Sequence, residues 1–382
     1  MDCSPSPFED LDVQIRGRLP SPDTRQVWID AARAVAICFI VLIHVSDYLL
    51  WDTRWLKRDP GVWWTANVYN ALVHGGTGLF VMISGALLLA PRVGQSAGEF
   101  FVKRILRIVP PFVIWAAIYF AWRIYAEEET LAWSQFPYSL ATGAAYYHLW
   151  FLPMILGLYL FTPLLRSILA RALPGVVVGW LVLWFCWFSI VPAFRHYFGL
   201  EPLGENLPFY IHYLAYLGYF VLGFALSRMR LRSIGIVLAI VGWMIGVSLT
   251  AFLTWRATVA AGGMLSEERG DHNFYPHVLL LTVCAFLVLR NLPWERLQSC
   301  RLAYRAVIAV SGASFTIYLL HALFLEAQTY HFSPIKFRFP VTPWIGIPAI
   351  TVLVIAECLL FTILIKWAFC GRLRAVGRII AP

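Results

Sequence analysis

The sequence predicts an all-α protein, a polytopic transmembrane helix bundle of about ten membrane-spanning helices with both termini cytoplasmic. Composition is the first observation behind this prediction, because the 382 residues are 60% hydrophobic and only 13% charged, with a mean hydropathy of +0.70. A soluble domain carries roughly 45–50% apolar and about 25% charged residues. The second observation is a series of long apolar runs, and the third is the uneven distribution of lysine and arginine between them. A soluble enzyme, a disordered chain and a disulfide-rich secreted module are therefore excluded.

Apolar runs of about 20 residues, each long enough to cross the hydrocarbon core of a bilayer, recur along the chain. We expect spans at 27–50, 67–90, 108–126, 148–168, 174–192, 210–228, 232–254, 274–291, 306–328 and 343–370. Residues 1–26 lack the basic start and apolar core of a signal peptide, so we expect a cytoplasmic tail and a retained first helix. Residues 27–370 then form one membrane domain, and residues 371–382 a basic cytoplasmic tail.

Lysine and arginine lie mainly in alternate connecting segments, which is the pattern that sets orientation in a membrane. With the N-terminus inside, 21 of the 30 basic residues fall on the cytoplasmic side, and the acidic run 127–129 falls outside. We therefore expect a multi-pass protein of the cell (inner) membrane. The net charge of +9 is scattered between apolar runs, so we expect the lipid bilayer, and no nucleic acid, as a partner.

Motifs of several enzyme classes are absent from the sequence. It contains no H-E-x-x-H and no C-x-x-C, so we expect no metal ion and no thiol redox pair. None of the seven cysteines lies in a segment that we place outside, so we expect no disulfide framework. The glycines of residues 74–89 lack the G-K-[ST] of a phosphate-binding loop and instead favour close helix packing.

The segments that we place outside are rich in aromatic residues. Trp51, Trp55, Trp63 and Trp64 belong to the first, and Trp133, Tyr138, Tyr146 and Tyr147 belong to the second. One interpretation is the aromatic belt that membrane proteins carry at the lipid–water interface. The other is a stacking surface for the face of a sugar, and the sequence leaves both open.

The first predicted helix carries the most informative set of polar residues. Arg33 and His44 are eleven residues apart, which returns to within about 20° of the same helix face and rises about 16 Å. Asp30 and Asp47 lie on the same face, and Asp47 is one turn beyond His44. Polar residues within a span are candidates for function, so His44 is a candidate general base and Asp47 a candidate to orient it. A satisfied buried histidine is the alternative interpretation.

A second polar face occurs near the C-terminus, where Ser311, Ser314, Tyr318 and His321 lie within about 80° of one another on a helix. Ser314, Tyr318 and His321 are secondary candidates for the site, as is Asp30 on the first helix, with helix packing through small and hydroxyl side chains as the alternative. Glu326 lies about 140° from His321 and is a poor partner for it.

The third candidate group is Lys103, Arg104 and Arg107, which precede an apolar run. Arg104 and Arg107 share a helix face, and guanidinium groups match phosphate oxygens in geometry. The sequence therefore offers a phosphate-binding pair, with an orientation signal as the alternative interpretation.

The order of the motifs resembles that of a known family. The chain contains I-D-x-x-R with a histidine after ten further residues, G-x-x-x-F-x-x-x-S-G at 76–85, K-R-x-x-R-x-x-P at 103–110, H-L-W-F-L at 148–152 and S-x-x-x-Y-x-x-H at 314–321. This order resembles the acyltransferase-3 family of integral membrane O-acyltransferases, over residues 26 to 370. I-D-A-A-R stands where relatives often have L-D-x-L-R, which is a conservative difference.

The resemblance implies an acyl-CoA donor, usually acetyl-CoA, on the cytoplasmic side and a hydroxyl of a glycan or glycolipid as acceptor on the outer side. Arg33 and His44 match the first-helix motif of the family, and Arg104 and Arg107 match its R-x-x-R motif. Three further residues match family positions whose roles are less settled: Ser84, His148 and His321. The chain lacks the C-terminal esterase-like domain of some relatives, so transfer is expected to finish within the helix bundle.

Two other functional classes compete with this interpretation. In a transporter or exporter of a small molecule or lipid-linked sugar, Arg33, His44 and Asp47 would line a path; the absence of internal repeats and of paired broken helices weighs against it. A non-catalytic assembly or receptor subunit would tolerate loss of His44. Release of free CoA from acetyl-CoA separates an enzyme from both.

Overall fold

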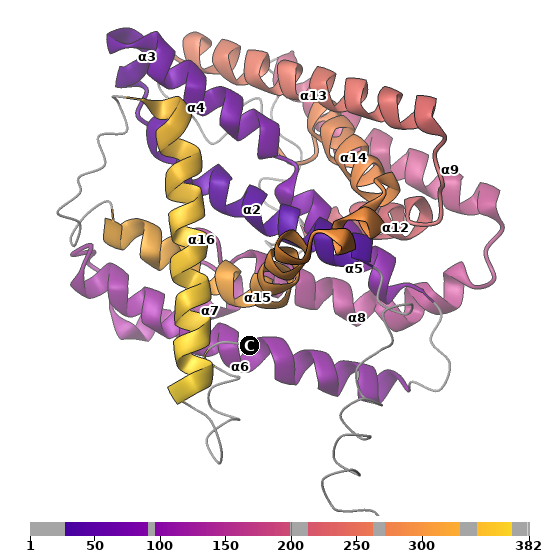
Figure 1. Cartoon of the computed structure of the whole chain (residues 1–382), viewed down its shortest axis with the longest axis horizontal. Helices are drawn as coiled ribbons and strands as arrows, with labels where there is room; N and C mark the ends of the chain where they lie inside the picture. Colours follow the sequence, from indigo (N-terminus) through magenta and orange to yellow (C-terminus); the bar gives the residue numbers. More distant parts are fainter. Residues whose placement is uncertain are drawn as a thin grey trace, which may run out of the picture.

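The structure is a computed structural model that describes residues 27–90, 96–198, 200, 213–262, 272–328, 342–368 and 380. Within these residues every regular element is helical (Figure 1). The predicted all-α bundle is thereby confirmed. The predicted tails, 1–26 and nearly all of 371–382, lie outside the described residues.

The described helices follow the predicted apolar runs closely. They are α2 (Val27–Leu50), α3 (Arg54–Arg58), α4 (Pro60–Val73), α5 (Gly76–Leu88), α6 (Ala97–Tyr125), α7 (Phe136–Thr142), α8 (Phe151–Leu169), α9 (Pro174–Phe185), α10 (Val191–Tyr197), α12 (Tyr216–Leu226), α13 (Ser233–Ala260), α14 (Pro276–Asn291), α15 (Arg301–Glu326) and α16 (Pro343–Ala368). Short 3-10 or π turns join some of them, at Trp133–Gln135, Cys186–Ile190 and Trp294–Ser299.

Eight of the described helices, counting α4 with α5 and α9 with α10 as single helices, are long and apolar enough to cross a membrane. Two of the predicted spans correspond to shorter apolar helices, the 11-residue α12 and the 16-residue α14. The count of about ten spans and the cytoplasmic placement of the termini stay predictions. The chain is a multi-pass membrane protein by the length and composition of these helices.

Three helix boundaries differ from the predicted spans in ways that matter for the site. Helix α6 begins at Ala97, capped by Ser96, so the R-x-x-R motif lies within its first turns and not in a loop before it. The second predicted span starts earlier, at Pro60, and is interrupted between α4 and α5 at His74 and Gly75. Helix α8 begins only at Phe151, so His148 lies in the turn before it.

Helix α2 forms the centre of the bundle, where α4, α5, α14, α15 and α16 contact it. Its buried alanines, among them Ala32 and Ala36, let these neighbours approach closely. Helices α5 and α12 pack very closely: a Cβ atom on Gly85 would lie 1.8 Å from the carbonyl oxygen of Phe220, and one on Gly223 would lie 2.1 Å from that of Met82. The sequence-based expectation of close packing along 74–89 holds here.

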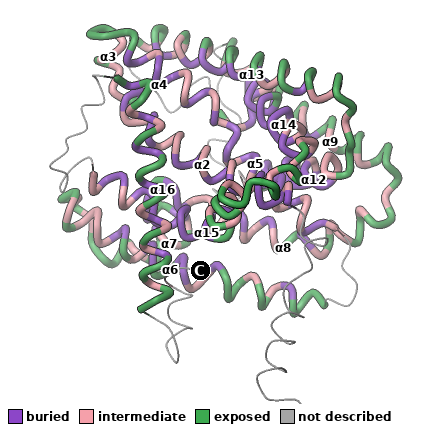
Figure 2. The backbone as a smooth tube through the Cα atoms, viewed as in Figure 1, coloured by how far each residue is buried: buried purple, intermediate pink, exposed green. Residues whose placement is uncertain are grey.

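The outer helices carry the apolar surface. In Figure 2 the exposed residues concentrate on α9, α13 and the outer side of α16, while the buried residues concentrate on α2, α5 and α14. Exposed side chains include Leu183 on α9 and Leu238 on α13, at 71% and 63% exposure. Apolar faces of this kind suit lipid contact, and they leave the polar residues to the interior of the bundle.

Candidate active site

A cavity of about 530 Å³ lies between α2, α5, α6, α8 and α15, and we call it the arginine cavity. Nine of the residues predicted for the site line it: Arg33, His44, Asp47, Ser84, Arg104, Arg107, His148, Ser314 and Tyr318. The first-helix motif, the R-x-x-R motif and the polar face of α15 therefore converge on one space, although they lie far apart in the sequence.

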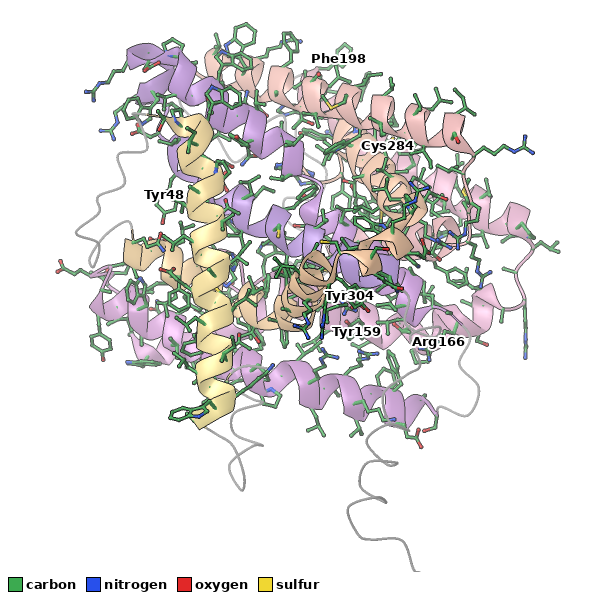
Figure 3. All side chains as sticks on the ribbon, in the orientation of Figure 1. Tyr48, Tyr159, Arg166, Phe198, Cys284 and Tyr304 are labelled. Carbon is green, nitrogen blue, oxygen red and sulfur yellow. The ribbon has the colours of Figure 1, made fainter. Side chains whose placement is uncertain are left out.

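The guanidinium group of Arg104 is held by aromatic rings. It lies over the rings of Phe100 and Tyr159, with 5.6 Å to each ring centroid. Arg166 approaches Phe100 as well, at 4.9 Å, and its Nε donates to the carbonyl oxygen of Leu88. Figure 3 shows Tyr159 and Arg166 in the space between α8 and α6. Cation–π contacts fix the position of a guanidinium without neutralising its charge, so this end of the cavity stays basic.

Three predicted residues, Lys103, Asp30 and His321, lie outside the lining of this cavity. Lys103 is exposed on α6 and does not line the cavity. Of the four basic residues predicted for the site, only Arg33, Arg104 and Arg107 line it. Asp30 is buried at 8% exposure, 3.9 Å from Nη1 of Arg33, and it accepts a hydrogen bond of 2.9 Å from Ser311. Asp30 therefore positions Arg33 from outside the cavity lining, and Ser311 holds Asp30 in place.

The imidazole of His44 lies beside the carboxylate of Asp47. Nδ1 of His44 is 3.7 Å from Oδ2 of Asp47, as the spacing along α2 predicts. Oδ1 of Asp47 accepts a hydrogen bond of 3.0 Å from Nδ2 of Asn70 on α4. Oδ1 of Asn70 is 3.1 Å from Nδ1 of His74, and because an amide oxygen can only accept, His74 donates. A chain of polar groups thus fixes the carboxylate that faces His44.

One family model matches the chain. It is described as an acyltransferase domain, and it covers residues 26–363. The chain belongs to the acyltransferase-3 family. The resemblance drawn from the motif order is therefore confirmed. Comparison with curated proteins and with solved structures gives no match.

The fold of this acyltransferase brings the predicted polar face of α2 and that of α15 together at His44. The ring of His321 stacks on that of His44, with centroids 5.2 Å apart and an interplanar angle of 26°. Nδ1 of His321 faces the carbonyl oxygens of Ile317 and Tyr318, at 3.2 and 2.8 Å. In a neutral ring the proton is therefore on Nδ1, which leaves a lone pair on the fully buried Nε2.

His148 completes a cluster of three histidines. Its ring lies 4.9 Å from that of His321, and it is only 3% exposed. Neither of its ring nitrogens has a hydrogen-bond partner among the described residues, although its backbone carbonyl accepts a hydrogen bond from the hydroxyl of Tyr318. Buried polar atoms without a partner are rare, and in a cavity they indicate a position for a ligand.

Sequence reasoning missed Asn70 and His74, which line the cavity, and Arg166, which lies next to it over the ring of Phe100. Asn70 and His74 were detectable in principle, because they are spaced i, i+4 within a predicted apolar span. Arg166 carried no such signal, since a single arginine at the end of a span reads as an orientation signal.

Proposed function

We propose that the protein transfers an acetyl or other short acyl group from cytoplasmic acyl-CoA to a hydroxyl of an extracytoplasmic glycan or glycolipid. Membership of the family supplies the acyltransferase activity. The observation that supports the finer proposal is a single cavity that joins three arginines to the His44–Asp47 pair. It provides one space for a long, anionic donor whose reactive end must reach a base.

In this proposal the phosphates of the donor bind to the three arginines of the arginine cavity. Acyl-CoA carries a 3′-phospho-ADP group with several negative charges, and Arg33, Arg104 and Arg107 supply the opposite charge. Arg104 is held between two rings and Arg33 beside Asp30, so little side-chain entropy is lost when phosphate binds.

The pantetheine arm follows the apolar walls of the cavity. Ile40 on α2 lies between Arg33 and His44 in sequence, and Phe80 on α5 and Ile155 on α8 line the same space. The rise of about 16 Å along α2 from Arg33 to His44 is a distance that this slim and largely uncharged arm can cover. The thioester is thereby delivered beside His44.

His44 acts as the general base in this proposal. It takes the proton of the acceptor hydroxyl while the oxygen forms a bond to the thioester carbonyl carbon. The C–S bond then breaks, and His44 returns its proton to the leaving sulfur, which departs as the thiol of free CoA. Asp47 stabilises the imidazolium that forms, and Asn70 holds Asp47 in place.

His148 is the group that we assign to the thioester carbonyl oxygen. It lines the cavity with its ring nitrogens unpartnered among the described residues, and a neutral imidazole can donate one N–H. Donation to the oxygen becomes stronger as negative charge develops there during attack.

Acceptor-dependent release of CoA tests the proposal. Purified full-length protein in lipid nanodiscs is given acetyl-CoA, with and without a hydroxyl-bearing acceptor, and free CoA is measured. We expect release that depends on the acceptor. A transporter or a non-catalytic subunit would bind without releasing CoA, and that result would contradict the proposal. Incubation with labelled acetyl-CoA alone separates this direct transfer from a route through a covalent acyl-His44 intermediate, because only the second route labels the protein.

A further inference from the structure

A second and larger cavity, of about 1370 Å³, lies at the other end of α6. The end of α6, the acidic segment that follows it, the turn before α8 and the end of α15 form its walls. We call it the glutamate cleft, because Glu127, Glu128, Glu129 and Glu326 all line it. The charge distribution of the chain predicts that this cleft opens on the outer side.

The glutamate cleft borders the proposed catalytic base. Trp150 lines both the cleft and the arginine cavity. Tyr147 lines the cleft, and its ring centroid is 5.0 Å from that of His44. Between these two in sequence is His148, whose buried ring nitrogens have no partner among the described residues. A molecule in the cleft would therefore reach His44 past Tyr147 and Trp150, at the point where polar atoms are available to a ligand.

Both aromatic side chains and carboxylates line the cleft. Glu127 accepts hydrogen bonds from Nε1 of Trp122, at 3.1 Å, and from the hydroxyl of Tyr146, at 2.7 Å. These bonds fix both rings, and the ring of Tyr146 lies 4.7 Å from that of Tyr147. Flat rings can pack against the C–H faces of a sugar, while carboxylates accept hydrogen bonds from its hydroxyls. Of the aromatic residues in the predicted outer segments, Tyr147, which is 45% exposed, thus fits the interpretation as a sugar-stacking surface. Tyr146 is buried, stacks on Tyr119 and packs behind the ring of Tyr147.

The charge of the cleft is negative. Arg123 pairs with Glu129 through two hydrogen bonds of 2.9 and 2.7 Å and is the one basic residue among the described residues that line the cleft. It also holds the pKa of Glu129 below its usual range, so that carboxylate stays ionised at neutral pH. Arg123 also attracts Glu127, without a hydrogen bond to it, whereas Glu128 has no cationic partner among the described residues of the lining. An acidic ligand would meet like charge here, whereas a neutral or amine-bearing one would not.

We propose that the glutamate cleft binds the acceptor, and that this acceptor is a saccharide without acidic groups, either neutral or amine-bearing. This inference rests on the proposed acyl transfer, to which it adds the class of acceptor. The saccharide lies with a face on the aromatic wall and its hydroxyls toward the carboxylates. One hydroxyl passes Tyr147 and Trp150 to meet His44.

Direct binding tests the proposal without any acyl transfer. Purified full-length protein is titrated by calorimetry with three oligosaccharides of equal length: cellopentaose, which is neutral, deacetylated chitopentaose, which is cationic, and pentagalacturonate, which is acidic. We expect the first two to bind at least about tenfold more tightly than the third at low salt, with the difference shrinking as salt is raised. Equal or tighter binding of the acidic oligosaccharide, or no binding of any of the three at about 10 mM, would overturn the proposal.

A charge reversal in the cleft sharpens this test. Glu128→Lys is expected to weaken binding of the cationic oligosaccharide by about tenfold and to strengthen binding of the acidic one. The matched control is Glu295→Lys, because Glu295 is equally exposed and does not line the cleft. Unchanged preferences in the Glu128 variant would count against the cleft.

The design also separates this proposal from the proposed function. Acetyl-CoA affinity should be the same in both variants, because neither residue lines the arginine cavity. Saccharide binding in the cleft without any release of CoA would contradict the acyl transfer alone. CoA release that depends on an acceptor but is insensitive to Glu128→Lys would contradict the cleft alone.

Discussion

The arginine cavity and the glutamate cleft lie at opposite ends of the same helix, and their charges are opposite. Arg104 and Arg107, near the start of α6, line the first, whereas Arg123, near its end, lines the second and is already paired with Glu129. The 29 residues of α6 extend about 43 Å, more than the roughly 30 Å hydrocarbon core of a bilayer. One helix can therefore reach both surfaces and present an anion site at one and a site that repels anions at the other.

The difference between the two cavities provides a physical basis for sorting substrates. In the proposed function, we expect an anionic acyl-CoA to be attracted to the arginine cavity and repelled by the glutamate cleft, and we expect the reverse for an amine-bearing saccharide. The two cavities approach each other at Trp150 and at the histidines around His44. We call this region, Trp150 and the histidines around His44, the meeting point of the two cavities.

The largest effect is expected at His44. His44→Gln preserves size and hydrogen bonding but cannot take up a proton, so acyl transfer should fall about 10²- to 10⁴-fold while acetyl-CoA affinity stays nearly unchanged. Asp47→Asn should lose less, because Asp47 orients and stabilises the base. Transfer onto an acceptor is measured in membranes, with acetyl-CoA binding on the same preparations. Substantial transfer by a well-folded His44→Gln protein would move the role of base to His321.

The second effect concerns His148 at the same meeting point. His148→Phe preserves the ring and its packing against Tyr119 and Tyr318 but removes the N–H donor. We expect kcat to fall about 10²- to 10³-fold, with little change in the KM for acetyl-CoA. Full activity in the phenylalanine variant would limit His148 to a packing role.

The third effect separates the arginine cavity from the cleft. Charge-assisted contacts to phosphate are worth about 1.5–3 kcal/mol, so Arg107→Ala should weaken acetyl-CoA binding roughly 10- to 100-fold. Arg107→Lys should restore part of this, because the charge returns without the fork geometry. Arg171→Ala is the control, since Arg171 is an exposed arginine outside both cavities. Unchanged affinity in an Arg104→Ala, Arg107→Ala double variant would leave these residues as orientation signals.

The smallest effect is expected in the cleft. Glu129→Gln should weaken saccharide binding only about two- to fivefold, because Glu129 is an accessible carboxylate whose charge Arg123 largely compensates. Because Arg123 lowers the pKa of Glu129, that carboxylate stays ionised somewhat below its usual pKa range and is lost only when the pH falls further. Saccharide affinity of the wild type should therefore decline on acidification. Affinity that rises as the pH falls would contradict the role of the carboxylates.

The sequence could predict those parts of the site that depend on local geometry. The face that joins Arg33, His44 and Asp47 follows from the period of one helix, and the i, i+3 pair of Arg104 and Arg107 follows in the same way. The structure bears out these relations because every span must satisfy its backbone hydrogen bonds as a helix.

The parts that the sequence could not predict depend on packing between distant segments. The stacking of His321 on His44 requires the register of α15 against α2, and no local pattern records that register. The bond from Asn70 to Asp47 depends in the same way on how α4 lies against α2. The boundary of α8 was also misplaced, because His148 precedes an apolar run that could continue through it as a helix.

Formation of a ternary complex by His44→Gln protein tests the central claim most directly. The variant is saturated with acetyl-CoA and then titrated with cellopentaose, and bound ligands and free CoA are quantified. If the two cavities hold separate substrates that meet at His44, both ligands bind together, each with nearly its wild-type affinity, and no CoA is released. Mutual exclusion of the two ligands, or CoA release at the wild-type rate, would contradict the account.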